Sequence, residues 1–180
     1  MEVIETQLSG VVIIEPKVFG DERGFFLESF QQERYAKEAG IDLPFVQDNH
    51  SRSAKGVLRG LHFQLKKPQG KLVRVVRGEV YDVAVDINPQ SPTYGQYEGV
   101  ILSETNKRQF WVPPGYAHGF LVLSETADFE YKCTDYYDPS DEGGLIWNDP
   151  TVNIDWPLKE PTLSAKDSVL PTLAELNAGQ

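Results

Sequence analysis

The sequence predicts a mainly β domain, arranged as an antiparallel sandwich or barrel with a few short helices. Short stretches rich in β-branched and aromatic residues follow one another through the middle of the chain, and turn residues separate them. Little helical sequence lies between these stretches, which favours antiparallel neighbours over a parallel sheet with helical crossovers. The chain has 180 residues, of which 40% are hydrophobic, and this fits a single globular domain over residues 1–180.

The first predicted element is a helix over residues 31–39. Ser29 is its expected N-cap, and Gln32 stands three residues later in the capping-box position. Gly40 directly follows the helix and is expected to end it. After this helix the residue pattern changes to that of strands.

The remaining predicted elements are strands and one short C-terminal helix. The helix is expected over residues 173–177, where Thr172 can cap it and Glu175 stands in the capping-box position. Turn sequences such as Lys67-Pro68-Gln69-Gly70 and Pro113-Pro114-Gly115 separate the strands. The predicted strands are residues 56–65, 71–77, 79–87, 97–103, 108–112, 117–123 and 127–134.

Charge and composition exclude several classes of function. The formal net charge is −10, and so negative a surface repels nucleic-acid phosphates. No apolar run approaches the roughly 20 residues of a membrane helix, so we expect no membrane partner either. Cys133 is the only cysteine and the first residues are acidic, which favours a cytoplasmic location. No dinucleotide fingerprint, P-loop or hydrolase elbow occurs.

Two of the three histidines, His62 and His118, lie in predicted strands. Histidine is the side chain best suited to proton transfer near neutral pH. The patterns Gly56-x5-His62 and Pro113-x-Gly115-x2-His118 resemble the two signature motifs of cupins, which are small double-sheet, jelly-roll β-barrels. The resemblance therefore implies a cupin-type barrel with both histidines near its cavity.

The chain departs from the metal-binding cupins at the positions of the metal ligands. Those proteins continue the first motif with a second histidine and then a glutamate. In this chain Gln64 replaces the second histidine, and Lys71 occupies the region where the glutamate is expected. A tight transition-metal site needs about three or four good protein ligands, and a nearby ammonium repels the ion. We therefore expect a cupin shell with no metal and no other cofactor.

Most of the chain, from about residue 3 to residue 168, resembles the dTDP-4-dehydrorhamnose 3,5-epimerases. Enzymes of this family act on dTDP-4-keto-6-deoxyglucose on the way to dTDP-L-rhamnose. The matching blocks occur in one order, which is more specific than any single motif. They are DERGFF (21–26), FVQDNHS (45–51), LRGLH (58–62), QGKLV (69–73), PPGYAHGF (113–120), YKCT (131–134), WNDP (147–150) and S-x-KD (164–167).

The resemblance implies a set of acid–base residues. His62 would be the base, and Asp167 would accept a hydrogen bond from the far imidazole nitrogen and so fix the tautomer. Lys71 would lie beside the C4 carbonyl and stabilise the enolate oxygen electrostatically. Tyr131 would be the acid, because a phenol with an unperturbed pKa of about 10 stays protonated at neutral pH.

The resemblance also implies a site for the nucleotide and the sugar. Arg23 and Arg59 match the arginines that bind the diphosphate, to which the planar guanidinium is well suited. Tyr137 matches the aromatic residue that stacks on thymine, and His118 is expected to bind the sugar. The other matching positions are Glu28, Gln47, Asp48, Asn49, Glu142 and Lys166.

Arg59 and His62 raise a question of geometry. They are an odd number of residues apart, so a regular strand would point them to opposite faces. A bulge at Gly60 could bring both to one cavity; otherwise Arg59 would serve the site of a partner subunit. The family is homodimeric with N-terminal strands packed across the interface, and we expect the same of this chain.

Three alternatives to a 3,5-epimerase remain open from the sequence. A relative that epimerises only C3 or only C5, or acts on another 4-keto sugar nucleotide, would use the same acid–base pair. A metal-dependent cupin oxygenase or isomerase is disfavoured by Gln64. A non-catalytic sugar-nucleotide binding protein would retain the arginines but would have no use for His62, Lys71 and Tyr131 together.

Overall fold

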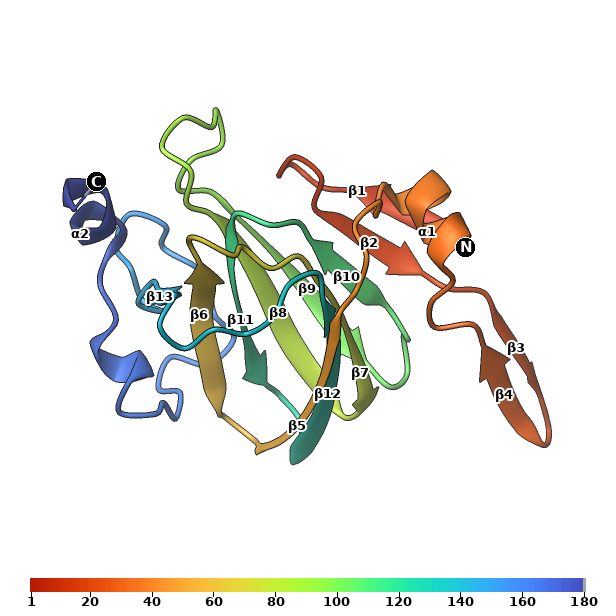
Figure 1. Cartoon of the computed structure of the whole chain (residues 1–180). Helices are drawn as coiled ribbons and strands as arrows, with labels where there is room; N and C mark the ends of the chain where they lie inside the picture. Colours follow the sequence, from red (N-terminus) through yellow and green to blue (C-terminus); the bar gives the residue numbers. More distant parts are fainter. Residues whose placement is uncertain (180) are drawn as a thin grey trace.

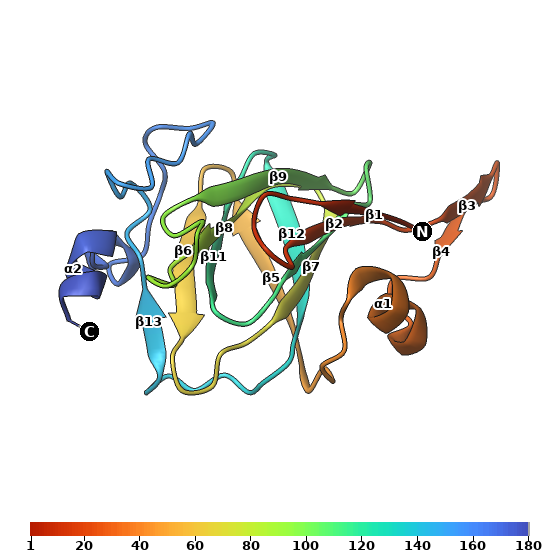
Figure 2. The ribbon, with the colours of Figure 1, turned by 90° about the horizontal axis from the view of Figure 1, so that it is seen from above.

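Two antiparallel sheets lie face to face in the computed structural model, which describes residues 1–179 (Figures 1 and 2). Gln180, the last residue of the predicted domain, lies outside the described residues. In spatial order the six-stranded sheet consists of β1 (Glu2–Glu5), β2 (Val12–Glu15), β10 (Gln109–Val112), β7 (Lys71–Arg77), β12 (Thr126–Cys133) and β5 (Gln47–Ala54). The five-stranded sheet consists of β13 (Glu142–Gly144), β6 (Leu58–Gln64), β11 (Tyr116–Val122), β8 (Glu79–Asp86) and β9 (Tyr97–Ser103). The predicted mainly β, double-sheet architecture is confirmed.

The remaining elements lie outside the sandwich. Strands β3 (Val18–Asp21) and β4 (Gly24–Leu27) form a separate hairpin that projects away from the body (Figure 1). Helix α1 (Gln32–Ala39) follows it, and the 3-10 helix η1 (Asp167–Val169) and helix α2 (Leu173–Ala178) lie at the opposite end of the molecule. None of the helices in the described chain has the length and the apolar run that a membrane crossing requires.

Hydrophobic side chains form three buried groups, because successive strand residues point to opposite faces of each sheet. The first group lies between the sheets and includes Val73, Phe110 and Phe129. A second group covers the outer face of the five-stranded sheet, where the C-terminal segment contributes Trp156 and Leu173. The third lies under α1 on the outer face of the other sheet. The C-terminal segment and α1 are therefore fixed to the sandwich by apolar contacts.

The predicted elements agree with the structure except near the N-terminus. Both helices and all the predicted strands are present within one or two residues of their expected ends. The N-cap of α1 is Gln31 rather than Ser29, because the Gln31 side chain accepts the hydrogen bond from the Arg34 amide. Gly40 ends α1 in the left-handed conformation, as expected. Strands β1 to β5 and β13 were not predicted from the sequence.

A bulge in β6 interrupts its pairing with β11. His62 pairs with His118, but Arg59 pairs with Phe120, so three steps along β6 match two steps along β11. Gly60 lies at this point with a φ of +117°, and a Cβ atom there would lie 2.7 Å from the His118 carbonyl oxygen. Only glycine fits the close approach of the two backbones. The predicted bulge at Gly60 is confirmed.

Candidate active site

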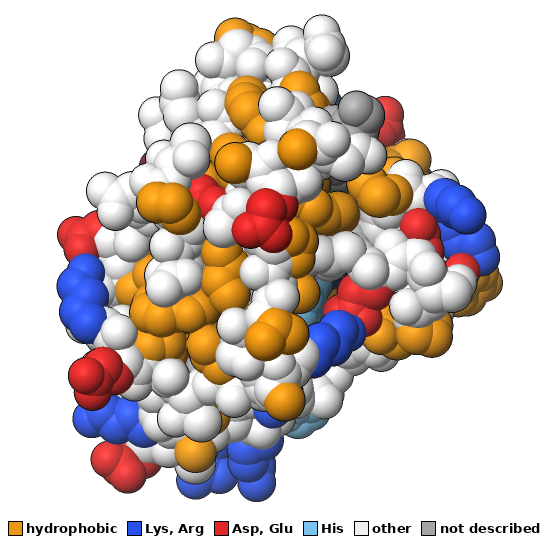
Figure 3. Space-filling view, turned by 90° about the vertical axis from the view of Figure 1, so that its left-hand side faces the viewer, with side chains coloured by type: hydrophobic (Ala, Val, Ile, Leu, Met, Phe, Trp, Pro, Cys, Tyr) orange, Lys and Arg blue, Asp and Glu red, His pale blue; other side chains and the backbone are white. Residues whose placement is uncertain are grey.

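A cavity of about 690 Å³ lies between the two sheets, a size typical of small-molecule sites. Seen from the side of the C-terminal segment, a histidine lies in a recess bordered by acidic and basic side chains (Figure 3). The predicted residues that line the cavity are Gln47, Asp48, Asn49, Arg59, His62, Lys71, His118, Tyr131, Tyr137, Glu142, Lys166 and Asp167. Arg59 and His62 are both among them, so the bulge at Gly60 brings their side chains to one site within one chain.

His62 and Asp167 form a hydrogen-bonded pair on the five-stranded wall. The imidazole Nε2–H donates to Asp167 Oδ1 over 2.7 Å, and the Gly60 N–H donates to Oδ2 over 3.1 Å. Burial alone would raise the pKa of Asp167, but these hydrogen bonds hold it below its usual value. The carboxylate is therefore ionised at neutral pH, and with the proton on Nε2 the imidazole Nδ1 carries a free lone pair.

The C-terminal segment positions Asp167 by docking onto the start of β6. Thr162 forms a parallel bridge with Val57, in which the Leu58 N–H donates to the Thr162 carbonyl oxygen and the Thr162 N–H donates to that of Gly56. The Asp167 N–H then donates to Ser164 Oγ over 3.0 Å. A residue 105 positions from His62 is thus held against it by backbone hydrogen bonds.

Lys71 and Tyr131 lie on the opposite wall, in neighbouring strands of the six-stranded sheet. The Lys71 Nζ atom is 5.7 Å from the centre of the Tyr131 ring. Burial raises the pKa of the Tyr131 phenol and lowers the pKa of the Lys71 ammonium. The phenol consequently stays protonated at neutral pH, whereas the charged form of the lysine is less favoured here than in water.

A second histidine–carboxylate pair lies beside the first. His118 is directly opposite His62 in the β6–β11 ladder, and its Nε2–H donates to both oxygens of Asp82 over 2.9 Å. Asp82 is fully buried, and this burial raises its pKa. Asp82 was missed in the sequence, although an acidic residue in the inward register of Val80 and Ala84 is a signal that could have found it.

Glu142 connects the catalytic pair to the rim of the cavity. Its Oε2 accepts from Tyr137 Oη over 2.7 Å and from Lys166 Nζ over 2.6 Å, and its Oε1 lies 3.8 Å from His62 Nε2. Burial would raise the pKa of Glu142, but the hydrogen bonds from Lys166 and Tyr137 lower it. The carboxylate is therefore ionised and fixes the Tyr137 side chain at the edge of the site.

Three more predicted residues of the cavity lining, Arg59, Gln47 and Asn49, are held by short polar contacts. Arg59 Nε donates to Ser53 Oγ over 2.9 Å. Gln47 Oε1 accepts from the Tyr137 N–H over 3.0 Å, and Gln47 Nε2 donates to Asn49 Oδ1 over 3.2 Å. These side chains belong to the polar part of the cavity lining.

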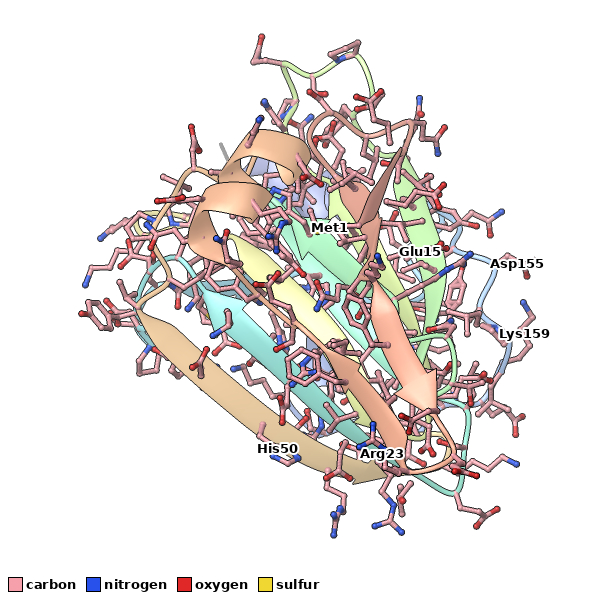
Figure 4. The ribbon with its side chains drawn as sticks, turned by 90° about the vertical axis from the view of Figure 1, so that its right-hand side faces the viewer. Met1, Glu15, Arg23, His50, Asp155 and Lys159 are labelled. Carbon is pink, nitrogen blue, oxygen red and sulfur yellow. The ribbon has the colours of Figure 1, made fainter. Side chains whose placement is uncertain are left out.

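Two predicted residues, Arg23 and Glu28, do not line the cavity of the same chain. Arg23 stands at the tip of the β3–β4 hairpin, pairs with Asp21 and has a side chain 87% exposed (Figure 4). Glu28 pairs with Arg34 beside α1. The structure therefore does not bring them to the cavity of their own chain, because the hairpin projects away from the sandwich, and their part in the site stays a prediction.

Gln64, which replaces the second histidine of the cupin motif, forms hydrogen bonds to the backbone. Gln64 is buried, and its amide forms hydrogen bonds to backbone groups of the loops that follow β6 and β12. Within residues 1–179 no three His, Cys, Asp or Glu side chains are grouped so that they could hold a metal ion.

Comparisons with known proteins agree with this geometry. The sequence profile described as dTDP-4-dehydrorhamnose 3,5-epimerase matches residues 5–175. The dTDP-4-dehydrorhamnose 3,5-epimerase of Salmonella typhimurium is 58% identical over 175 residues, which are 96% of this chain and 96% of that protein.

Solved structures give the same result. The crystal structure of dTDP-6-deoxy-D-glucose-3,5-epimerase from Legionella pneumophila, in complex with dTDP-4-keto-L-rhamnose, superposes with a TM-score of 0.95 at 59% identity and covers 99% of this chain and 95% of that one. A 3'-monoepimerase from Streptomyces bikiniensis, in complex with dTDP-quinovose, gives 0.92 at 33% identity, with 97% and 89% covered. The backbone fold alone therefore does not separate double from single epimerases.

Proposed function

Because the chain belongs to the dTDP-4-dehydrorhamnose 3,5-epimerase family, we propose that it converts dTDP-4-keto-6-deoxy-D-glucose into dTDP-4-keto-L-rhamnose by epimerisation at C3 and C5. The chain is an isomerase. The observation that carries the assignment of residues is that a histidine–carboxylate pair and a partly buried phenol occupy opposite walls of one cavity. Inversion of a carbon requires a proton to leave one face and return to the other, and this arrangement provides for both steps.

His62 is the base in this proposal. Its Nδ1 lone pair takes the proton from the carbon beside the ketone, and the C–H electrons form the enolate double bond. Asp167 accepts from Nε2 over 2.7 Å and is ionised, so it stabilises the imidazolium as it forms. General base catalysis of this kind contributes about 10²- to 10⁴-fold to a rate.

Lys71 stabilises the enolate in this proposal. Negative charge develops on the C4 oxygen as the proton leaves, and an ammonium fixed in a dry cavity binds that charge more strongly than it binds the neutral ketone. Burial lowers the pKa of Lys71, while nearby Cys133, Asp82 and Glu142 act in the opposite direction. The buried carboxylates of Asp82 and Glu142 therefore help to keep the lysine protonated.

Tyr131 returns the proton to the opposite face. Its O–H bond breaks as the new C–H bond forms, and the enolate electrons pass to that carbon. The products of one turnover are the inverted carbon, a phenolate at Tyr131 and an imidazolium at His62. Exchange with solvent restores the phenol and the free base before the second carbon reacts.

The rim residues bind the nucleotide in this proposal. Tyr137 is half exposed, so its ring face is available for stacking on thymine. Arg59 lies on the cavity wall and is suited to the diphosphate. His118, whose tautomer is fixed by Asp82, binds a sugar hydroxyl through Nδ1.

A homodimer would complete the diphosphate site. The β3–β4 hairpin exposes Phe19, Phe25 and Phe26, and a projecting apolar surface of this kind is typical of a protein interface. Two chains related by a twofold axis would place each hairpin against the other sandwich. Arg23 and Glu28 would then contribute to the partner's cavity. We retain the cytoplasm as the proposed location, because the only cysteine, Cys133, is a buried free thiol.

Proton exchange in heavy water tests the function directly. The chain, incubated with dTDP-4-keto-6-deoxy-D-glucose in D₂O, should place deuterium at both C3 and C5, as read by NMR. Exchange at one carbon only would instead support a single epimerase of the same class. No exchange at either carbon would overturn the proposed function.

A further inference from the structure

We propose that Gln64 is a positioning residue that holds Tyr137 in place for the nucleobase, through hydrogen bonds to the peptide groups on both sides of that tyrosine. The proposal rests on the proposed function, in which Tyr137 stacks on thymine. Gln64 itself forms no part of the acid–base machinery. It occupies the last position of β6, two residues after His62 and on the cavity wall.

The side-chain amide of Gln64 is fully used by two backbone segments. Its Nε2 donates to the Lys67 carbonyl oxygen over 2.7 Å and to the Tyr136 carbonyl oxygen over 3.1 Å. Its Oε1 accepts from the Asp138 N–H over 2.8 Å. Gln64 is only 5% exposed, so water cannot readily replace these bonds. One amide therefore fixes both peptide units that flank Tyr137.

Two further glutamines hold the same segment. Gln47 Oε1 accepts from the Tyr137 N–H over 3.0 Å, and Gln69 Nε2 donates to the Asp135 carbonyl oxygen over 2.8 Å. Residues 135–138 lie between β12 and β13 and belong to no helix or strand. The backbone of four consecutive residues is thus attached to the cavity wall by three amide side chains, of which Gln64 is the most buried and forms the most bonds.

Tyr137 depends on this attachment because its ring is not packed into the core. The residue is half exposed, and its hydroxyl donates to Glu142 Oε2 over 2.7 Å. A stacking aromatic is useful only if its plane is held at the right place before the ligand arrives, because ordering it on binding weakens affinity. The backbone on either side, fixed by Gln64, therefore sets the position of the ring.

Only an amide satisfies these three contacts. A glutamate at this position keeps the size and the acceptor for the Asp138 N–H, but it replaces the two N–H donors with an oxygen that faces the carbonyls of Lys67 and Tyr136. Two carbonyls facing a carboxylate repel it. The Gln64→Glu variant should therefore release the segment without creating a cavity.

The test compares dTDP affinity with turnover. We expect Gln64→Glu to raise the dissociation constant for dTDP about tenfold, as measured by calorimetry, because buried hydrogen bonds that position the ring are lost. The kcat for the 4-keto sugar at saturation should stay within about threefold of the unmodified chain, since His62 and Tyr131 are untouched. Inorganic diphosphate, which lacks the base, should bind both proteins equally well.

The matched control is Gln109→Glu. Gln109 is also a buried glutamine, 1% exposed, with its amide hydrogen-bonded to Tyr35 and Ser29 outside the catalytic cavity. The same change in charge, with the loss of the buried hydrogen bond from Gln109 Nε2 to Ser29, should leave dTDP affinity unaltered. If both glutamates weaken dTDP binding equally, the loss reflects general destabilisation and the proposal is wrong.

A double-mutant cycle with Tyr137→Ala separates this inference from its premise. If Gln64 acts through Tyr137, the combined variant should bind dTDP no more weakly than Tyr137→Ala alone. Full additivity, or an unchanged dissociation constant in Gln64→Glu when Tyr137→Ala weakens binding, would overturn the role of Gln64. Failure of the proposed function would appear separately, as absence of proton exchange in the unmodified chain.

Discussion

The two walls of the cavity use burial in opposite ways. On the five-stranded wall each histidine has its own buried carboxylate, Asp167 for His62 and Asp82 for His118. On the six-stranded wall Lys71 and Tyr131 are controlled mainly by burial, which lowers the pKa of the lysine and raises that of the tyrosine. These environments support the proposed roles, in which the five-stranded wall accepts a proton and the six-stranded wall donates one and holds a cation.

This difference explains why two elements far apart in sequence meet at the site. A base needs a partner that stabilises the cation it becomes, and the C-terminal segment supplies Asp167 by docking on β6. A phenol that must stay protonated needs no such partner, and a strand interior suffices. A reaction through an enolate needs both features: polar groups already in place around the base, and a proton donor that is shielded from water.

The largest expected effect comes from removing the base of one wall or the acid of the other, because each removal blocks a different proton transfer. His62→Ala should lower both deuterium incorporation and epimerisation by about 10³-fold, because the change removes the proposed base. Tyr131→Phe should lower epimerisation by a similar factor but retain more exchange, since deprotonation survives and only return from the opposite face is lost. NMR in D₂O measures both quantities in one experiment.

The control for this pair is His50→Ala. His50 also borders the cavity, but its side chain is 53% exposed and bonds to Asp128 over 2.8 Å, so its replacement should change either quantity by less than about twofold. Equal loss of exchange in His62→Ala and Tyr131→Phe would contradict the assignment of one base and one acid. The two walls would then share both steps.

The strand pattern explains how much of this site the sequence could predict. The boundaries of the strands that carry His62, Lys71, Tyr131 and His118 were predicted closely, so the meeting of these residues in one barrel followed from the fold and the family resemblance. Asp82 escaped notice because a buried carboxylate inside an apolar strand has meaning only when its partner is known. A single sequence records no distance between β8 and β11.

The N-terminal third shows the opposite case. Strands β1 to β4 are only four residues long, and β5 is rich in polar residues, so no clear alternation distinguishes them from loops. Arg23 was placed at the site by resemblance, whereas its position depends on where the hairpin projects. Contacts that depend on a second chain cannot be derived from the pattern of one.

The second prediction concerns the pH dependence that the six-stranded wall imposes. In the proposed mechanism Lys71 acts as an ammonium and Tyr131 as a phenol, so activity should fall as the pH rises through either pKa. Burial places the pKa of Lys71 below its usual 10.5 and that of Tyr131 above its usual 10.0. A guanidinium stays charged throughout this range. Lys71→Arg should therefore move the alkaline limit of kcat/KM upward and lower its maximum by about tenfold.

Lys159→Arg is the matched control for that experiment. Lys159 pairs with Asp155 on the surface, far from the cavity (Figure 4), and its replacement should leave the pH profile unchanged. If Lys71→Arg retains the alkaline limit of the unmodified chain, another group sets that limit and the lysine is not needed as a cation. Tyr131 would then be the only residue of the six-stranded wall with a proposed part in the reaction.

The smallest expected effect is that of Arg23→Ala, which tests whether the cavity needs an arginine from outside its two walls to bind the diphosphate. Arg23→Ala should raise KM for the sugar nucleotide by about tenfold with little change in kcat, because the lost contact is to the diphosphate and not to the reacting carbons. Arg23 lies at the hairpin tip, so within a dimer its guanidinium would serve the partner's cavity. The steady-state kinetics of the single variant show only that the arginine matters.

Mixing two defective chains shows which cavity Arg23 serves. In a heterodimer of Arg23→Ala and His62→Ala chains, the cavity with an intact His62 receives its arginine from the other chain only if the hairpin crosses the interface. Such a mixture should regain a fraction of sites with the unmodified KM after subunit exchange. A mixture that shows only the raised KM of Arg23→Ala would mean that each chain supplies its own arginine, and the hairpin would then have to fold back toward its own sandwich when substrate binds.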